Sequence, residues 1–309
     1  MSALSSEADE VMWNKACTLV QLVASSVRVA ETAGGVIKKI TSSADLKIVD
    51  KSTNGNKDLQ TEADRAAQFC IEQSLQTKFH NKVNIVGEEE ITSAVPNVEL
   101  GACPDVLKLN DKYGTSEFAQ AAKTHSPLLV QVTVLIGIAY KGRSVAGVIH
   151  QPFYGENGRT VWAIDGVGVH GLEVKRNQNE RIVVTTRSHF TPMVQSALDI
   201  LEKKKLLDKL ERVGGAGYKV LKCLEDSAAY VFASPGCKKW DTAAPEAVIR
   251  ASGGELTDIS GRRLYYGQDA QRQNTGGVLA TASWVKHQEY VDAISDDLKK
   301  ALPEFSAKQ

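Results

Sequence analysis

The stretch Trp240-Asp241-Thr242-Ala243-Ala244-Pro245-Glu246 says more about the fold than any other part of the chain. An apolar run follows it at 247–251, and Gly253-Gly254 comes directly after that run. Because glycine commonly ends a helix, the pattern predicts a helix over 242–251.

Asp241 is then expected at the N-cap of this helix or just before it, where free amides and the helix dipole concentrate positive potential. Lys238 and Lys239 precede it and add two cations. The local pattern leaves two interpretations open. Asp241 is either a capping residue, or a carboxylate that takes part in metal and phosphate chemistry.

The composition is that of an ordinary globular protein. The chain has 309 residues, of which 42% are hydrophobic and 24% are charged. A chain of this size buries about 75% of the surface that it exposes when unfolded. Lys and Arg total 37, as do Asp and Glu, so the net charge gives no reason to expect binding to nucleic acid or to an anionic membrane. Any recognition of phosphate must therefore be local.

The cysteines and the N-terminus favour a cytoplasmic protein. The five cysteines lack metal-type spacing, and their odd number cannot pair fully within one molecule. The first ten residues, MSALSSEADE, are acidic where a signal peptide would be basic. The apolar run at 128–139 is too short to span a bilayer and is β-branched, so we expect a core strand there. The oligomeric state is not fixed by the sequence, and we favour a monomer.

Hydrophobic periodicity predicts helices and strands in alternation. Helices are expected over 11–40, weakened at Gly34-Gly35, and from 58 to about 79, with short strands at 46–49 and 84–86. An antiparallel sheet region is expected from strands at 130–140, 145–150, 160–164 and 181–186. The remainder predicts helices at 192–207, 219–224, 242–251 and 283–302, with strands at 229–233, 256–259 and 277–281. Helices packed on sheets in alternating layers give an α+β sandwich.

Other polar motifs carry candidate site residues. Glu88 follows the predicted strand at 84–86, and Asp58 precedes the second helix. Taken singly, Glu88 is a solvated acid and Asp58 a helix N-cap. Thr186 and His189 follow a predicted strand, and a glycine-rich loop at 213–219 contains Gly215 and Lys219. Such a loop more often makes a tight turn than an anion cradle, and a lone histidine is more often a surface residue.

Together these motifs resemble the lithium-sensitive, magnesium-dependent phosphatases of the inositol monophosphatase superfamily, over about residues 19–302. The resemblance implies a layered αβαβα sandwich of the inositol monophosphatase and fructose-1,6-bisphosphatase type. The whole chain, 1–309, would be a single phosphatase-like unit. An N-terminal α+β half at 10–184 would carry metal-site residues, and a C-terminal α/β half at 185–309 would carry nucleotide-site residues.

The resemblance also implies roles for individual residues. Glu88 and Asp241 match metal ligands for Mg²⁺, and Li⁺ would inhibit by occupying a metal site. Asp58 matches the aspartate that orients the nucleophilic water through a threonine, here Thr115. The nucleotide branch of the family, which acts on adenosine 3',5'-bisphosphate, is the closer match. Its pocket implies that a nucleotide contacts the following residues of this chain: Thr186, His189, Gly215, Lys219 and Asp241.

One block departs from the family. The family's central motif is Asp-Pro-Leu-Asp-Gly-Thr, whereas this chain reads Asn110-Asp111-Lys112-Tyr113-Gly114-Thr115. Aligned on Gly114-Thr115, the two ligand positions hold Asn110 and Tyr113, and the interval from Glu88 is shorter than in typical members. An Asn oxygen brings no charge and a protonated Tyr is a poor ligand for Mg²⁺. Asp111 is the candidate substitute if the shortened loop bends.

Three functional hypotheses follow. The first is a Mg²⁺-dependent phosphatase that releases phosphate from adenosine 3',5'-bisphosphate, impaired by the altered motif. The second is a non-catalytic nucleotide-binding protein or a variant isoform. The third is a fold destabilised by the loss of a central strand. Inositol polyphosphate 1-phosphate is the competing substrate class.

Overall fold

The computed structural model describes residues 7–42, 49–50, 59–80, 82–88, 129–175 and 179–303. The chain divides into two compact units. The first comprises residues 1–125 together with 150–160, and the second comprises 126–149 and 161–309.

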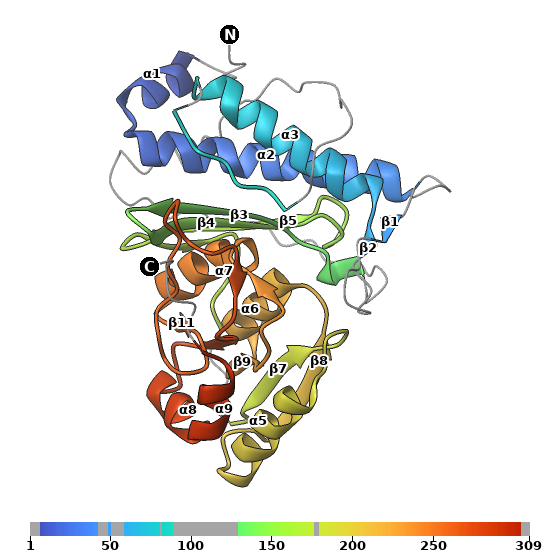
Figure 1. Cartoon of the computed structure of the whole chain (residues 1–309). Coiled ribbons are helices and arrows are strands. Elements are labelled where there is room, and N and C mark those ends of the chain that lie inside the picture. The colour runs from blue at the N-terminus through green and yellow to red at the C-terminus, as the bar shows by residue number, and fades with distance from the viewer. Residues whose placement is uncertain are drawn as a thin grey trace. The chain divides into compact units, whose positions relative to one another are not determined.

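Two packed helices form the body of the first unit. Its elements in chain order are α1 (Glu7–Lys15), α2 (Thr18–Thr41), β1 (Val49–Asp50), β2 (Leu59–Gln60) and α3 (Glu62–Lys78). Strands β1 and β2 pair antiparallel, and α2 packs along α3 (Figure 1). The buried face of α2 is lined by small and β-branched residues such as Val23, Val27 and Ala30, which permits this close contact between helices.

Helix α2 runs through Gly34-Gly35 without a break, so the expected weak point is wrong. A β-carbon on Gly34 would lie 2.3 Å from Nε2 of His150, which lies near the end of the strand Arg143–Gln151 and is assigned to the same unit. Gly34 therefore allows a buried histidine to approach the helix. The helical region is interrupted earlier, at Ala16-Cys17 between α1 and α2.

The start of α3 is defined by Thr61, not by Asp58. Thr61 is the N-cap, and a reciprocal capping box joins it to Asp64. Asp58 itself lies outside the described residues, but the interpretation of Asp58 as the cap of this helix is wrong. No strand forms at 84–86, where one was expected.

The second unit contains two main sheets. The four-stranded sheet has the order β3 (Val134–Tyr140), β4 (Arg143–Gln151), β5 (Arg159–Ile164), β6 (Gly168–His170). Residues 150–151 of β4 and 159–160 of β5 are assigned to the first unit. Strand β3 begins later than the expected strand at 130–140, because a 3₁₀ turn, η2 (Leu129–Gln131), occupies its first residues.

The five-stranded sheet has the order β11 (Glu255–Thr257), β13 (Val278–Thr281), β9 (Ala229–Phe232), β7 (Ile182–Thr186), β8 (Lys209–Val213). Strand β7 belongs here and not with the preceding antiparallel hairpins, which corrects the expected pairing. It runs parallel to both of its neighbours, β8 and β9, whereas β9, β13 and β11 are antiparallel. A small ladder joins β10 (Cys237–Lys238) to β12 (Gln273–Asn274).

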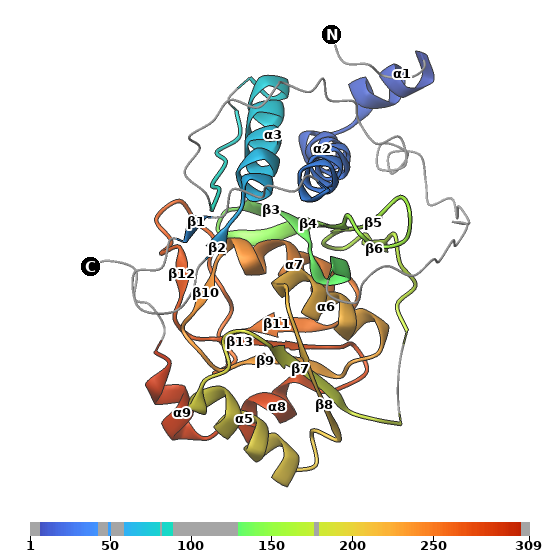
Figure 2. The ribbon, with the colours of Figure 1, turned by 90° about the vertical axis from the view of Figure 1, so that its right-hand side faces the viewer.

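Helices α6 (Ala216–Glu225) and α7 (Trp240–Ala251) lie between the two sheets of this unit (Figure 2). Helices α5 (Pro192–Lys203), α8 (His287–Ala293) and α9 (Asp296–Ala301) lie on the far side of the five-stranded sheet. The core of the unit fills these layers with fully buried side chains from both sheets and from the helices, including Ile149, Leu221 and Leu279.

Small residues in the Trp240–Glu246 stretch allow α7 to lie directly on the four-stranded sheet. A β-carbon on Gly137 would be 2.4 Å from Cβ of Ala243, and one on Gly147 would be 2.5 Å from the carbonyl oxygen of Ala244. The Ser144 hydroxyl donates to the Ala243 carbonyl at 2.6 Å. This packing fixes the N-terminal turn of α7, and with it the position of Asp241.

Candidate functional site

The carboxyl ends of three parallel strands meet at one edge of the five-stranded sheet. These ends are Thr186 in β7, Val213 in β8 and Phe232 in β9. In open sheets of this kind, ligands commonly bind in the crevice beyond the carboxyl ends of the strands. All the sequence-predicted nucleotide residues that follow β7 and β8 therefore come to the same edge.

The loop after β8 is held in an unusual conformation that only glycine accepts easily. Gly215 has φ +67°, and a β-carbon there would lie 2.3 Å from the carbonyl oxygen of Gln131. The Gly214 N–H donates to Oε1 of Gln131 at 2.6 Å. Gly215 is also the N-cap of α6, and no side chain caps that helix. The first amides of α6 are consequently oriented toward the strand ends without a side-chain acceptor.

Lys219 lies in the first turn of α6 and is only 6% exposed. Its Nζ lies 5.2 Å from the centroid of the Tyr230 ring, and no hydrogen bond or ion pair within the described residues engages it. Burial lowers the pKa of Lys219 to about 8, against the opposing effects of Cys237 and Asp241, and Arg187 lowers it further. A buried ammonium that lacks a hydrogen-bond acceptor and a counter-ion in direct contact is a ready binding group for an anion.

Asp241 lies inside the first turn of α7, so the expected position at or before the N-cap is wrong. The N-cap is Lys239, and the Asp241 carboxylate turns back to accept from the Lys238 N–H at 2.9 Å. The side chain is half-buried. Burial raises the pKa of Asp241, while the Lys238 amide, the Lys219 ammonium and the Cys237 thiol act in the opposite direction. Asp241 and Lys219 are thus close enough for the charge of each to shift the pKa of the other.

Thr186 and His189 are joined at the end of β7. The His189 N–H donates to Oγ1 of Thr186 at 3.2 Å, and Thr186 is buried. The His189 side chain is exposed, with Nδ1 at 2.9 Å from the Ser188 hydroxyl. The structure therefore presents a histidine ring to solvent beside a threonine fixed at the strand end.

The expected metal and catalytic residues are described only in part. Glu88 is exposed and belongs to the first unit, whereas Asp241 belongs to the second. The other residues that the sequence assigned to this chemistry, Asp58, Asp111 and Thr115 together with the altered positions Asn110 and Tyr113, lie outside the described residues. Within the described ranges, no group of three or more His, Cys, Asp or Glu side chains is arranged to hold a metal ion.

Four residues at this edge of the sheet were not singled out from the sequence. Gln131 anchors the glycine loop from a distant segment, and nothing in its local sequence indicates this contact. Tyr230 and Cys237 flank Lys219. Arg187 lies between Thr186 and His189, which were both predicted as site residues. Its positive charge at that position is the sequence signal that could have identified it.

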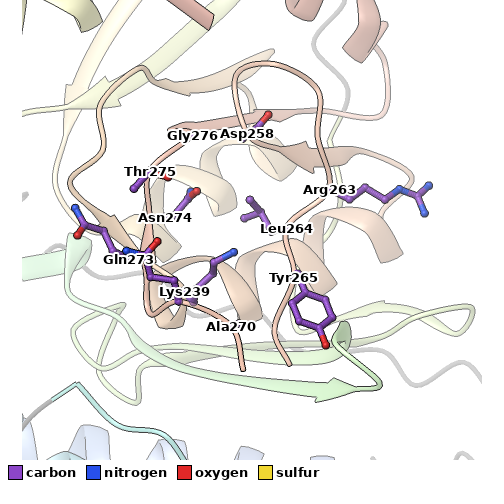
Figure 3. Close-up of a pocket in the computed structure, with 11 residues that line it drawn as sticks. Lys239, Asp258, Arg263, Leu264, Tyr265, Ala270, Gln273, Asn274, Thr275 and Gly276 are labelled. Carbon is purple, nitrogen blue, oxygen red and sulfur yellow. The ribbon is translucent and has the colours of Figure 1, made fainter. Parts of the chain in front are cut away.

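A separate small cavity lies beyond the N-cap of α7, with a volume of about 70 Å³. Figure 3 shows its lining residues around the opening, with the Arg263 side chain directed away. Its walls combine polar residues such as Lys239, Asp258 and Asn274 with apolar ones such as Leu264. Ligand pockets usually have volumes of about 300–1,000 Å³, so this cavity is too small for a nucleotide.

The described cysteines, Cys17, Cys70, Cys223 and Cys237, are free thiols. Among the described helices, none combines the length and apolar character needed to cross a bilayer.

Comparison with known proteins places the chain in a family. The model of the inositol monophosphatase family matches residues 19–298. A human protein named 3'(2'),5'-bisphosphate nucleotidase 1 is 39% identical, covering 92% of this chain and 97% of the relative. A Dictyostelium discoideum protein of the same name is 33% identical over 92% of this chain and 99% of its own.

Solved structures show the same fold. The IMPase of Thermotoga maritima matches with a TM-score of 0.60 at 18% identity, covering 90% of this chain and 98% of that one. CysQ from Bacteroides thetaiotaomicron matches with a TM-score of 0.58 at 20% identity, covering 85% and 97%.

The chain has the α+β fold of these phosphatases and belongs to the inositol monophosphatase family. Within that family, its similarity is to relatives named 3'(2'),5'-bisphosphate nucleotidase over most of both chains.

Proposed function

We propose that this protein is a phosphomonoesterase of the 3'(2'),5'-bisphosphate nucleotidase type, which converts adenosine 3',5'-bisphosphate to AMP and phosphate. The observation that carries the proposal is the buried Lys219, whose ammonium makes no hydrogen bond or ion pair within the described residues, together with the nearby charge of Asp241 and the uncapped start of α6. This arrangement suits a phosphate ester, because a cation and free amides stand at a strand edge where ligands bind. The names of the similar proteins support the same reaction.

The described residues divide the work of binding. Lys219 and the first amides of α6, beginning after Gly215, hold a phosphate group. Thr186 fixes the backbone of His189, whose exposed ring contacts the nucleotide. Asp241 lies beside Lys219 and contacts both the substrate and the metal. The ammonium of Lys219 thereby balances negative charge on the substrate.

The donor chemistry fits Mg²⁺. Members of the family generally depend on this ion, which prefers oxygen ligands and is usually held by one or two carboxylates together with substrate phosphate. Asp241 and Glu88 would supply such carboxylates, with Asp111 as the candidate substitute for a missing one. When bound, Mg²⁺ supplies Lewis-acid stabilisation of the phosphoryl oxygens and of the attacking water. Asp58 and Thr115 orient that water, and no covalent intermediate is formed.

A second candidate is a nucleotide-binding protein with weak or no catalysis. The replacement of the family's two motif aspartates by Asn110 and Tyr113 favours it, because both positions lose a negative charge next to the proposed metal site. The residues proposed to contact the nucleotide lie outside that block, at 186–241. We therefore expect the protein to bind the nucleotide and to hydrolyse it more slowly than family members that keep both motif aspartates.

The test is phosphate release from adenosine 3',5'-bisphosphate with and without Mg²⁺, compared with release from an inositol polyphosphate 1-phosphate. Preference for the nucleotide, dependence on Mg²⁺ and inhibition by Li⁺ are expected. Nucleotide binding measured by calorimetry without turnover would select the second candidate. Faster turnover of the inositol ester would reassign the substrate, and failure to bind or hydrolyse either compound would contradict the proposed function. A soluble cytoplasmic monomer is the proposed form of the protein.

A further inference from the structure

A substrate with two phosphates needs two separate sources of positive charge. The phosphate that is cleaved must lie at the proposed metal carboxylates, which include Asp241. The second phosphate is held away from that point by the sugar. It carries its own negative charge, which favours a charge-assisted contact elsewhere at the same edge of the sheet.

Arg187 is the residue that directly follows the carboxyl end of β7. Its N–H donates to the Val213 carbonyl at 3.1 Å, and its own carbonyl accepts from Nη2 of Arg212 at 3.3 Å. These two bonds tie the Arg187 backbone to the end of the neighbouring strand β8. The guanidinium lies over the glycine loop, with Nη2 3.3 Å from the point where a β-carbon on Gly214 would stand.

Nothing within the described residues engages this guanidinium. Arg187 is exposed, and its side chain takes part in no hydrogen bond, ion pair or ring contact there. Neighbouring arginines are occupied: Arg212 stacks on Phe190 at 3.9 Å, and Arg181, at the opposite end of β7, pairs with Glu289 at 3.9 Å. An arginine whose backbone is fixed and whose guanidinium makes no hydrogen bond or ion pair within the described residues is available to an anion.

The second observation is the buried Lys219. It is nine-tenths buried at the start of α6, its Nζ lies over the Tyr230 ring, and it makes no hydrogen bond or ion pair within the described residues. The positive charge of Arg187 lowers the pKa of Lys219. The glycine loop therefore connects the two cations: the Arg187 guanidinium lies over Gly214, and Lys219 lies in the first turn of the helix that follows Gly215. A phosphate bound at Arg187 would offset the repulsion between the two cations.

We propose that Arg187 binds the phosphate that is not cleaved, and so makes this site prefer bisphosphorylated over monophosphorylated nucleotides. The inference rests on the proposed nucleotide site and adds to it the residue that binds the second phosphate. The planar guanidinium suits this role better than a lysine, because it can make two parallel hydrogen bonds to one phosphate. Thr186, His189 and Gly215 keep the nucleoside contacts proposed above.

Calorimetry on the full chain tests the inference with two ligands. Adenosine 3',5'-bisphosphate carries both phosphates, and adenosine 3'-monophosphate lacks the second. Ca²⁺, another oxygen-binding cation, replaces Mg²⁺ to limit turnover during the titration. Arg187→Gln is expected to weaken binding of the bisphosphate about tenfold and to leave the monophosphate unchanged, since a charge-assisted hydrogen bond is worth about that much. Arg187→Lys keeps the charge without the fork and should lose less.

Arg181→Gln is the matched control. It removes the same charge from the amino end of the same strand, so it reports any long-range effect of net charge. Thermal unfolding of each variant confirms that it is folded. Equal weakening of both ligands by Arg187→Gln, or no weakening of either, would overturn the inference while leaving the nucleotide site in place. A wild-type chain that binds neither ligand would overturn the proposed function, and the inference with it.

Discussion

Lys219 and Asp241 act on each other across the space between α6 and α7, although no ion pair joins them. The carboxylate raises the pKa of the lysine and the ammonium lowers that of the aspartate, while burial has the larger and opposite effect on each. Burial therefore opposes the charged form of both groups, so the charge of each carries a cost to the fold. Such a cost is typical of side chains retained for ligand binding.

Replacing Lys219 should stabilise the fold and weaken binding. A pKa lowered from 10.5 to about 8 means that, below pH 8, the charged lysine costs the folded state about 3 kcal/mol relative to the unfolded chain. Lys219→Met removes that cost, so we expect the free energy of unfolding at pH 7 to rise by about 1–3 kcal/mol. The gain should shrink as the pH rises from about 8, where the folded lysine loses its proton, and should vanish above about 10.5, where the unfolded lysine has lost its proton as well. Denaturant unfolding and nucleotide calorimetry measure both effects, and a destabilised variant would show that the ammonium is net stabilising.

Asp241→Asn should keep the fold and lose activity. The amide oxygen can still accept from the Lys238 N–H, and the buried negative charge disappears. We expect Mg²⁺-dependent phosphate release to fall by about 100-fold or more, because a proposed metal ligand and its charge are lost. Asp292→Asn, an exposed position on α8, is the control and should retain wild-type activity. Unchanged turnover in Asp241→Asn would remove Asp241 from the mechanism.

Two glycine-to-alanine changes should move stability in opposite directions. Gly215→Ala places a β-carbon at φ +67° and 2.3 Å from the Gln131 carbonyl oxygen, so a loss of at least about 1–2 kcal/mol is expected together with weaker nucleotide binding. Gly35→Ala adds a methyl group to an exposed turn of α2 with nothing within 4 Å, so a gain of about 0.5–1 kcal/mol is expected. Melting temperatures of the two variants provide the comparison, and similar shifts would contradict the described loop geometry.

Buried His150 should make the fold sensitive to acid. Burial, with a smaller effect of Lys38, lowers the pKa of His150 to about 4, and its Nδ1 lies 2.9 Å from the Thr160 hydroxyl. Between pH 6.5 and 4 the unfolded chain binds a proton at this residue that the folded chain does not bind. The free energy of unfolding therefore falls with falling pH, by up to about 3 kcal/mol from this residue.

The measurement is denaturant unfolding between pH 7 and pH 4. His150→Asn should be less stable than the wild type at pH 7 but should lose less stability on acidification. His80→Asn, at an exposed position of the same unit, is the control. If the free energy of unfolding of His150→Asn falls between pH 7 and pH 4 as much as that of the wild type, His150 is not the cause of the acid sensitivity.

The sequence was most informative where local pattern and burial agree. Strands β4 and β5 and helix α7 are mostly buried, and they lie where the pattern placed them, within a few residues. Strand β8 was missed because Lys209–Val213 is a charged edge strand with mostly exposed side chains. The expected final helix is two helices, since Ser295 accepts from the Leu298 N–H at 3.4 Å and starts α9.

Partners far apart in the sequence limited the prediction of the site. Residues in motif strings, such as Lys219 and Asp241, could be named from the sequence, but their burial and mutual influence could not. Gln131 contacts the loop at Gly214 across 83 positions, and no local periodicity carries such information. The same reason explains why β7 was expected in the wrong sheet. Its parallel partners, β8 and β9, follow it in the chain, whereas the antiparallel strands with which it was grouped precede it.

The meeting of β7, β8 and β9 at one edge has an evolutionary consequence. Each strand supplies the rigid support, and the few residues after it make the contacts, so substrate choice can drift through replacements in short connecting segments while the interior stays constant. An exchange of residues 187–191 or 214–215 between relatives would therefore change substrate selectivity without changing the residues of the hydrophobic core.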